Sequence, residues 1–347
     1  MIIRSICRAM IILKKVEDQK ELIEMALKND VLRLLEEHRG ESISGQEIAG
    51  LFGVSRNAVW KVMCALKKSG YQIASVNNKG YTLAEDNDQI SPEGIAFYLS
   101  PAYCALEICA FDTIDSTNSE AKRRIAAGLA ETLLVVAGCQ TSGRGRRGRS
   151  FYSPADTGIY MTLAFHVRSR IEDVIRLTAA AAVAVVRAIE RLTMLHPEIK
   201  WVNDIYLNHR KICGILTEGV TDFEAGTVDH VLIGIGLNVS TKIFPAEIQT
   251  IAASLNTDEI PRNRWIAEIT NALLALIEAP DNGAFMNDYR RCSLVIGKRI
   301  IYTRGETAIS AEAIGIDDDG GLMVRHDDGT TATLKSGEIT LRLQEQL

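Results

Sequence analysis

The segment that most constrains this chain is Gly143–Gly148, in which three glycines and three arginines stand together. It lies between an apolar run, Leu133–Ala137, and an aromatic segment that begins at Phe151. Glycine lets the backbone approach a ligand closely, and each guanidinium offers a planar fork of donors that matches phosphate and carboxylate oxygens. The segment therefore predicts an anion-binding loop. On this segment alone, the alternative is a disordered basic loop or a nucleic-acid contact.

Further polar and glycine-containing motifs flank this loop in order along the chain: Asp115–Asn118, Gln140–Ser142, Lys200–Asp204, Arg210–Leu216 and Gly234–Val239. Together with the loop, they resemble the motif series of biotin protein ligases, in which the glycine–arginine loop binds the adenylate. The N-terminal part is similar to the helix-turn-helix of the bifunctional members, which double as biotin operon repressors. The resemblance therefore covers nearly everything from about residue 31 onward.

The length of the chain, 347 residues, exceeds one ordinary core and indicates several domains. Its composition, 47% hydrophobic and 24% charged, is typical of a soluble globular protein. We predict an N-terminal extension at residues 1–30, a winged helix-turn-helix DNA-binding domain at 31–84, a linker at 85–92, a biotin- and ATP-binding catalytic domain at 93–294 and a C-terminal domain at 295–347.

Charge and cysteine usage narrow the class of protein. A net charge of −5 excludes positive potential over the whole surface, although it is compatible with a local basic surface. The seven cysteines form no Cys-x-x-Cys pair, which favours reduced thiols over a disulfide framework or a zinc site. No apolar run approaches the ~20 residues that span a bilayer. These features predict a cytoplasmic protein.

Residues 31–69 show helix-turn-helix spacing. Apolar positions recur with a helical period, Gly53 provides the tight turn, and Ser44 and Ser55 can cap the second and third helices. A hairpin signal at residues 77–80 then predicts a wing.

The predicted winged helix has a charge of one sign, because no acidic residue lies between Glu47 and Glu85 whereas one arginine and several lysines do. Outward positions of the third helix and the wing are the predicted DNA contacts: Ser55, Arg56, Asn57, Trp60, Lys61 and Lys79. Burial in the core is the alternative for Trp60. For the whole domain, the alternative is a winged helix kept only for protein contacts.

The centre of the chain alternates strands and helices, as in an α/β or α+β domain. We predict strands at residues 106–111, 133–140, 158–167, 199–207, 211–219 and 231–239, and helices at 117–127, 174–192, 264–278 and 283–291. In the tail, short β-prone runs are broken by Asp317–Gly320 and Asp327–Gly329, which is turn chemistry and lacks the spacing of a calcium loop.

For the whole chain, the resemblance implies an α+β fold. Its parts are an N-terminal winged helix-turn-helix, a central mixed β-sheet with helices of the class II aminoacyl-tRNA synthetase-like type, and a C-terminal SH3-like β-barrel.

The resemblance also implies a two-step reaction. The biotin carboxylate attacks the α-phosphate of ATP to give biotinyl-5′-AMP and pyrophosphate, and a lysine of the biotin carboxyl carrier protein of acetyl-CoA carboxylase then accepts the biotinyl group. Both steps build negative charge on phosphate or acyl oxygens, so catalysis requires positioned cations and donors. The implied substrates are biotin and ATP with Mg²⁺. Operator DNA is the second implied partner, bound by a ligand-promoted homodimer.

Residue roles carry over where this sequence matches the family motifs. The catalytic set is Lys211, Arg144, Arg146 and Asp204, of which Asp204 either orients Lys211 or helps to hold Mg²⁺. The biotin-binding set is Ser116, Thr117, Asn118, Gln140, Gly143, Arg144, Gly145, Arg146, Lys211 and Gly214. The ATP- and adenylate-binding set is Arg146, Arg147, Lys200, Trp201, Asn203 and Asn238. No separate metal motif is predicted.

These residues also have structural alternatives. Lys211 can be a solubilising lysine at a strand edge, Asp204 a turn residue and Trp201 a core residue. Ser116 can simply cap a helix. The pair of glycines in Gly234–Gly236 permits either close approach of a ligand or relief of crowding between a helix and the sheet.

Two other functions compete with a bifunctional ligase. A repressor that senses biotinyl-AMP with little ligase activity is disfavoured by the intact Gly143–Arg149 loop and by Lys211. Ligation of lipoate is disfavoured because the Arg-Arg-x-x-Gly-Gly-Gly pattern of lipoate ligases is absent from the sequence.

Overall fold

The computed structural model describes residues 25–76, 79–128, 131–169, 173–222, 227–279, 283–304, 307–335 and 339–341. The chain divides into two compact units, Met1–Phe97 and Tyr98–Leu347. Most of the predicted N-terminal extension lies outside the described residues, whereas residues 25–30 begin a helix that runs to residue 37. Among the described residues, no helix is both long and apolar enough to cross a membrane.

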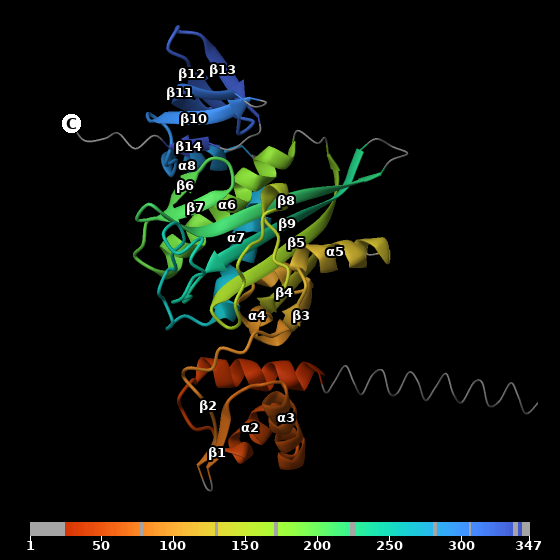
Figure 1. The fold of residues 1–347 in the computed structure, drawn as a ribbon. Helices are drawn as coiled ribbons and strands as arrows, with labels where there is room; N and C mark the ends of the chain where they lie inside the picture. Colours follow the sequence, from red (N-terminus) through yellow and green to blue (C-terminus); the bar gives the residue numbers. More distant parts are fainter. Residues whose placement is uncertain are drawn as a thin grey trace, which may run out of the picture. The chain divides into compact units, whose positions relative to one another are not determined.

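The first unit is the predicted winged helix-turn-helix. After the helix at residues 25–37 come α2 (Gly45–Phe52), α3 (Arg56–Lys68), β1 (Ile73–Val76), β2 (Gly80–Leu83) and α4 (Pro92–Tyr98) (Figure 1). Ser44 and Ser55 cap α2 and α3, because their side chains accept hydrogen bonds from the backbone N–H groups of Glu47 and Ala58. Gly53 ends α2 with a φ of 64°, which glycine adopts without strain. β1 and β2 pair antiparallel and form the wing.

The segment that follows the wing is attached to the first unit. Arg39 Nη1 donates to the carbonyl oxygens of Glu85 and Asn87 at 3.1 and 2.8 Å. The backbone N–H of Gln72 donates to Asn87 Oδ1 at 2.8 Å. These contacts attach residues 85–87 to the first compact unit, which continues to Phe97.

Within the described residues, the second unit is built on a seven-stranded mixed sheet (Figure 1). Its strands are β3 (Glu107–Ile114), β4 (Leu133–Gln140), β5 (Gly158–Ser169), β6 (Glu198–Lys200), β7 (Asp204–Leu207), β8 (Arg210–Asp222) and β9 (Thr227–Asn238). The strand order is β3-β4-β5-β9-β8-β7-β6, in which β3 and β4 are parallel and the other neighbours antiparallel. This topology resolves the choice between α/β and α+β in favour of α+β.

One predicted strand is wrong. Residues 199–207 form two short strands, β6 and β7, which pair with each other and are joined by a turn at residues 201–203. The density of apolar residues is misleading here because Trp201 and Val202 are buried by packing, and neither belongs to the hydrogen-bonded ladder.

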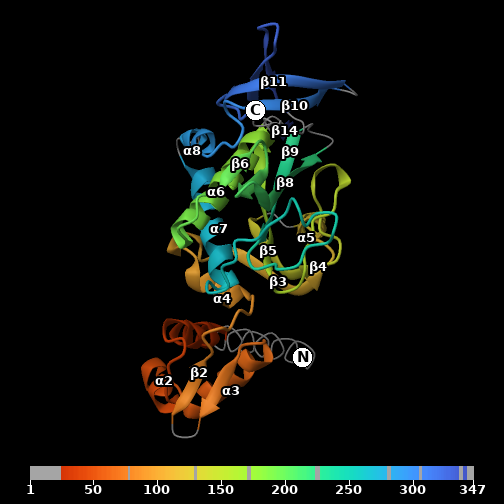
Figure 2. The ribbon, with the colours of Figure 1, turned by 60° about the vertical axis from the view of Figure 1, so that its left-hand side comes forward.

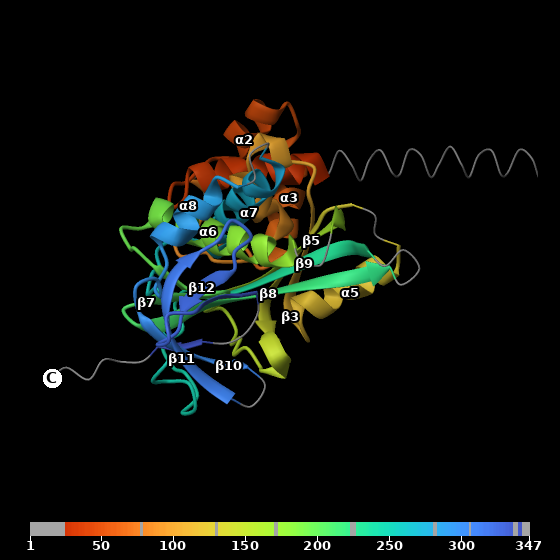
Figure 3. The ribbon, with the colours of Figure 1, turned by 90° about the horizontal axis from the view of Figure 1, so that it is seen from above.

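Helices cover both faces of the sheet. They are α5 (Thr117–Ala126), α6 (Asp173–Leu192), α7 (Arg262–Glu278) and α8 (Phe285–Arg291), with short 3₁₀ turns at η1 (Pro101–Tyr103) and η2 (Arg146–Gly148). α6 and α7 run side by side (Figure 2), and Figure 3 shows them on the opposite face of the sheet from α5. The contacts agree, because Thr217 of β8 meets Thr178 of α6 whereas the next residue, Glu218, meets Asn118 of α5.

The described part of the tail forms a five-stranded antiparallel sheet in the order β13-β12-β11-β10-β14. Its strands are β10 (Arg299–Arg304), β11 (Thr307–Ile316), β12 (Leu322–Arg325), β13 (Thr331–Leu334) and β14 (Ile339–Leu341). This sheet is the small β domain predicted for the tail. The two aspartate runs lie in the turns that precede β12 and β13, and no cluster of His, Cys, Asp or Glu among the described residues suits a metal ion.

Candidate functional site

A cavity of about 310 Å³ lies on the α5 face of the seven-stranded sheet. The predicted site residues that line it are Ser116, Thr117, Asn118, Gln140, Arg144, Gly145, Arg146, Lys200, Trp201, Asn203, Asp204, Lys211 and Gly214. The predicted residues outside its lining are Gly143, Arg147 and Asn238. The lining also contains residues outside the predicted set: Arg149, Ser150, Phe151, Ile215, Leu216, Gly234, Ile235, Gly236 and Ile339.

The start of α5 forms one polar end of the cavity. The backbone N–H of Thr117 donates to Gln140 Oε1 at 2.9 Å, and Gln140 Nε2 donates to Ser153 Oγ at 3.0 Å. The hydroxyl oxygens of Thr117 and Thr162 lie 2.8 Å apart. Because a backbone N–H can only donate, it fixes which way the Gln140 amide points. This end therefore presents neutral donors and acceptors in a fixed arrangement.

Glu218 anchors the first turn of α5 from β8. Its carboxylate accepts hydrogen bonds from Asn118 Nδ2 at 2.8 Å and from Lys122 Nζ at 2.7 Å. Burial alone would raise the pKa of Glu218, but the hydrogen bonds from Asn118 and Lys122 outweigh burial and hold this pKa below its usual value. An ionised Glu218 therefore holds Asn118 against the floor of the cavity at neutral pH.

Glycine is required at three positions around the cavity, because other protein atoms occupy the space that a side chain would need there. A Cβ atom at Gly234 would lie 2.1 Å from Asn118 Oδ1, and one at Gly236 would lie 2.4 Å from the ring of Phe151. At Gly143, a Cβ atom would lie 2.4 Å from the carbonyl oxygen of Phe151. Asn118 of α5 and Phe151 thus fill this space, which favours relief of crowding against the sheet, and the close approach of a ligand stays a prediction. Phe151 directly follows the loop motif, which is the signal that could have identified it.

An ion pair lies at the edge of the cavity nearest β7. Lys211 Nζ is 2.6 Å from Asp204 Oδ1. The backbone N–H of Lys211 donates to the carbonyl of Ile251, and its carbonyl accepts from the N–H of Ala253, both at 2.8 Å. The register of the β7–β8 pair also shifts between Ile205 and Tyr206, which is a β-bulge beside Lys211. Asn238, which lies outside the lining, supports the same segment by donating to the carbonyl of Ala253 at 3.0 Å.

The glycine–arginine loop is closed by its own backbone. The N–H of Gly145 donates to the carbonyl of Arg149 at 2.7 Å, and the N–H of Phe151 donates to the carbonyl of Gly143 at 2.8 Å. Arg147 has a φ of 56°, in the left-handed region. The loop therefore forms a compact hydrogen-bonded turn.

The turn at residues 201–203 forms another wall of the cavity. Arg146 Nη1 donates to Asn203 Oδ1 at 3.1 Å, so the loop and this wall are in contact. Asn203 Nδ2 in turn donates to the carbonyl of Ile215 at 2.8 Å. Trp201 is buried, with 4% of its surface exposed, as a core residue would be, and it also lines the cavity. Its role in ligand binding stays a prediction. Lys200 Nζ lies 5.4 Å from the ring centroid of Tyr206.

The predicted DNA contacts lie together on α3 and the wing of the first unit. Ser55 is used as the cap of α3, and Arg56, Asn57, Lys61 and Lys79 are exposed. Trp60 is 56% exposed, which excludes burial in the core.

A winged helix-turn-helix joined to a mixed-sheet unit, whose cavity is lined by arginines and lysines, is the arrangement expected of a protein that binds both DNA and an anionic ligand. A model of the biotin/lipoate A/B protein ligase family matches residues 110–238, and models of an HTH domain and of the biotin protein ligase C-terminal domain match residues 28–82 and 295–342. The bifunctional ligase/repressor BirA of Bacillus spizizenii is 34% identical over 87% of this chain and 95% of its own length. The chain belongs to the family of bifunctional biotin protein ligases and repressors.

Two further relatives agree with this assignment. The bifunctional ligase/repressor BirA of Escherichia coli is 27% identical over 88% of this chain and 95% of its own length. Among solved structures, the biotin protein ligase of Aquifex aeolicus in complex with biotin and ATP is 25% identical, with a TM-score of 0.56 over 68% of this chain and 98% of that one.

Proposed function

We propose that this protein activates biotin with ATP to biotinyl-5′-AMP and transfers the biotinyl group to a lysine of the biotin carboxyl carrier protein of acetyl-CoA carboxylase. One observation carries the proposal. The cavity joins a neutral polar end at Thr117 and Gln140 to a cationic end at Lys211 and Arg146, and Arg144 also lines the cavity. Biotin has the same polarity, because a neutral ureido ring lies at one end of the molecule and a carboxylate at the other.

The chemistry of both steps fits the cationic end. In the first step a carboxylate oxygen of biotin forms a bond to the α-phosphorus while pyrophosphate leaves. In the second step the carrier amine forms an amide with the acyl carbon, AMP leaves, and the amine loses a proton. Negative charge develops on phosphate or acyl oxygens in each step, and Lys211, held by Asp204, stabilises it.

Magnesium enters this scheme with the nucleotide. Mg²⁺ commonly binds through one or two carboxylates plus the phosphates of a substrate. Asp204 is the predicted carboxylate, and it faces Lys211 in this structure. When bound, Mg²⁺ would neutralise phosphate charge, while the contribution of the chain is to orient Lys211 and the two arginines.

Labelling of a purified carrier domain with biotin and ATP tests the ligase proposal directly. Labelling that needs both substrates is expected. A protein that binds operator DNA in response to biotinyl-AMP but does not label the carrier would instead be a sensor repressor.

Gly234→Ala is expected to raise the KM for biotin about five- to tenfold, because the new Cβ atom displaces Asn118 and breaks its hydrogen bonds below the cavity. Steady-state kinetics measures this change. Gly219→Ala, in the same pair of strands, is a matched control because its Cβ atom would meet only Val228, with the nearest methyl at 3.2 Å. Equal effects of the two substitutions would contradict the role of Gly234.

We further propose that the winged helix binds the biotin operator as a homodimer whose formation biotinyl-AMP promotes, and that the protein acts in the cytoplasm. A single winged helix with few phosphate contacts binds DNA weakly, whereas two copies on a palindromic site bind with useful specificity. The exposed cations of α3 and the wing support the proposal, in a protein whose net charge is −5.

Arg56→Ala and Lys61→Ala are each expected to weaken operator binding and to reduce the slope of log affinity against log salt by about one. Carrier labelling should not change. Fluorescence anisotropy over a salt series measures the slope. Lys28→Ala serves as a control in the same unit, because the Lys28 ammonium is already paired with Glu93 at 2.8 Å. An unchanged slope in both variants would exclude phosphate contacts by these two residues.

A further inference from the structure

The aspartate run before β12 forms a self-closed turn. Asp317 Oδ1 accepts hydrogen bonds from the backbone N–H groups of Asp319 at 3.0 Å and Gly321 at 2.6 Å. Gly320 has a φ of 84° and is buried, and a Cβ atom at this position would lie 3.0 Å from Ile175 Cγ2 of α6. The side chain of Asp317 therefore sets the conformation of a turn that packs tightly against the second unit's main helix.

This turn contacts the wall of the cavity. Trp201 Nε1 donates to the carbonyl oxygen of Gly320 at 2.9 Å, and both groups are buried. At the next residue, the hydroxyl of Tyr289 donates to the carbonyl of Val202 at 2.9 Å. The wall at residues 201–203 is thus supported by the C-terminal sheet as well as by α8.

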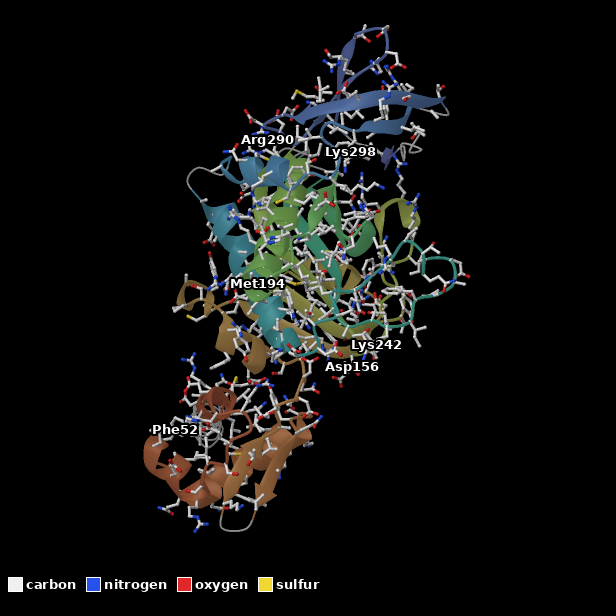
Figure 4. The ribbon with its side chains drawn as sticks, turned by 90° about the vertical axis from the view of Figure 1, so that its left-hand side faces the viewer. Phe52, Asp156, Met194, Lys242, Arg290 and Lys298 are labelled. Carbon is white, nitrogen blue, oxygen red and sulfur yellow. The ribbon has the colours of Figure 1, made fainter. Side chains whose placement is uncertain are left out.

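Arg290 attaches the same turn to α8. Arg290 Nε donates to the carbonyl of Ile316 at 2.8 Å, and Nη2 forms an ion pair with Asp318. Figure 4 shows Arg290 where α8 meets the C-terminal sheet. Ile339 of β14 also lines the cavity. The C-terminal sheet therefore contributes Ile339 to the lining of the cavity, and its turn before β12 accepts a hydrogen bond from a second lining residue, Trp201.

We propose that Asp317 is a positioning residue for the nucleotide side of the cavity. It shapes the turn that presents the carbonyl of Gly320 to Trp201, and Trp201 is in the set assigned above to ATP and the adenylate. The inference deepens the proposed ligase function and rests on it. Asp317 touches neither substrate, so its effect on the reaction passes through the orientation of Trp201.

The chain contains a matched control. Asp328 closes a second turn in the same sheet, where its Oδ1 atom accepts from the N–H of Thr330 at 2.9 Å. Asp327, Asp328 and Gly329 are exposed, and none of them lines the cavity. Asp317→Ala and Asp328→Ala therefore remove the same kind of turn contact at one position that touches the wall and at one that does not.

Asp317→Ala is expected to raise the KM for ATP about three- to tenfold with little change in kcat, as for the loss of one hydrogen-bond partner. Asp317→Asn keeps the accepting oxygen and should restore the wild-type KM. Asp328→Ala should behave as wild type. In the ¹H–¹⁵N spectrum, the indole N–H signal of Trp201, assigned with Trp201→Phe, should move in Asp317→Ala and stay in place in Asp328→Ala.

Several outcomes would overturn this assignment. They are an unchanged KM and indole signal in Asp317→Ala, equal changes in Asp317→Ala and Asp328→Ala, or failure of Asp317→Asn to restore function. The indole measurement requires no catalysis. A wild-type protein that does not label the carrier would therefore refute the ligase proposal, while the shift of the Trp201 signal still reports on the contact made by Asp317.

Discussion

Replacing Lys211 with alanine is expected to lower the rate of biotin adenylation by at least about two orders of magnitude while leaving the fold intact. The Lys211 ammonium lies 2.6 Å from Asp204 at the cationic end of the cavity, and its side chain is 33% exposed, so its removal opens no hole in the core. What is lost is a fixed positive charge at the place proposed for the reacting carboxylate. Single-turnover formation of biotinyl-AMP, measured with labelled ATP, reports this step without the carrier.

Two further substitutions sharpen this test. Asp204→Asn keeps Lys211 but weakens its partner, so it should reduce the rate by less than Lys211→Ala does. Lys242→Ala removes an exposed lysine of the same unit, whose side chain is 77% exposed, and should leave the rate unchanged (Figure 4). Near-normal turnover in Lys211→Ala would exclude its proposed role.

Replacing Arg144 with glycine is expected to shorten the retention of biotinyl-AMP by about 10- to 100-fold, because a charged hydrogen-bond donor is removed from the lining of the cavity. The released intermediate should then label lysines on unrelated proteins. Retention can be followed by rapid filtration of preformed complex, and promiscuous labelling by incubation with albumin.

Arg147→Gly provides the comparison within the same loop. Arg147 lies outside the cavity lining and has a φ of 56°, so glycine removes an equal charge without straining the backbone. If both variants release the intermediate equally fast, then loop charge or flexibility, not the position of Arg144, controls retention. If Arg144→Gly holds the intermediate as long as wild type, the loop does not close over it.

The winged helix could be predicted closely because its signals are local. Ser44 and Ser55 cap helices through hydrogen bonds to residues three positions later, and Gly53 turns the chain with its own backbone freedom. The secondary structure of residues 199–207 was harder to predict. A segment of this apolar density fits a strand, but here its centre is a turn in which Trp201 and Val202 contact the C-terminal sheet and α8.

The lining of the cavity was likewise predicted in part from local sequence signals and in part was visible only in the structure. The order of polar motifs identified most of its lining, since each motif lies at the end of a strand or helix that the local pattern indicates. Phe151 adjoins one of these motifs and Ile339 adjoins none, and both line the cavity. Gly234 and Gly236 were predicted to allow close approach of a ligand or to relieve crowding between a helix and the sheet, but nothing in the sequence indicates that Asn118 and Phe151 occupy this space.

The sequence by itself determined most of the succession of elements, the helix caps and the aspartate turns, and it predicted the residues that are proposed to carry the chemistry. Each of these depends on side chains and backbone groups within a few positions of one another. Only the tertiary structure decided that Asp204 pairs with Lys211 across a bulged strand pair and that Trp201 donates to Gly320, 119 residues further along the chain. Such contacts depend on strand register and on how separate sheets pack, which no local pattern encodes.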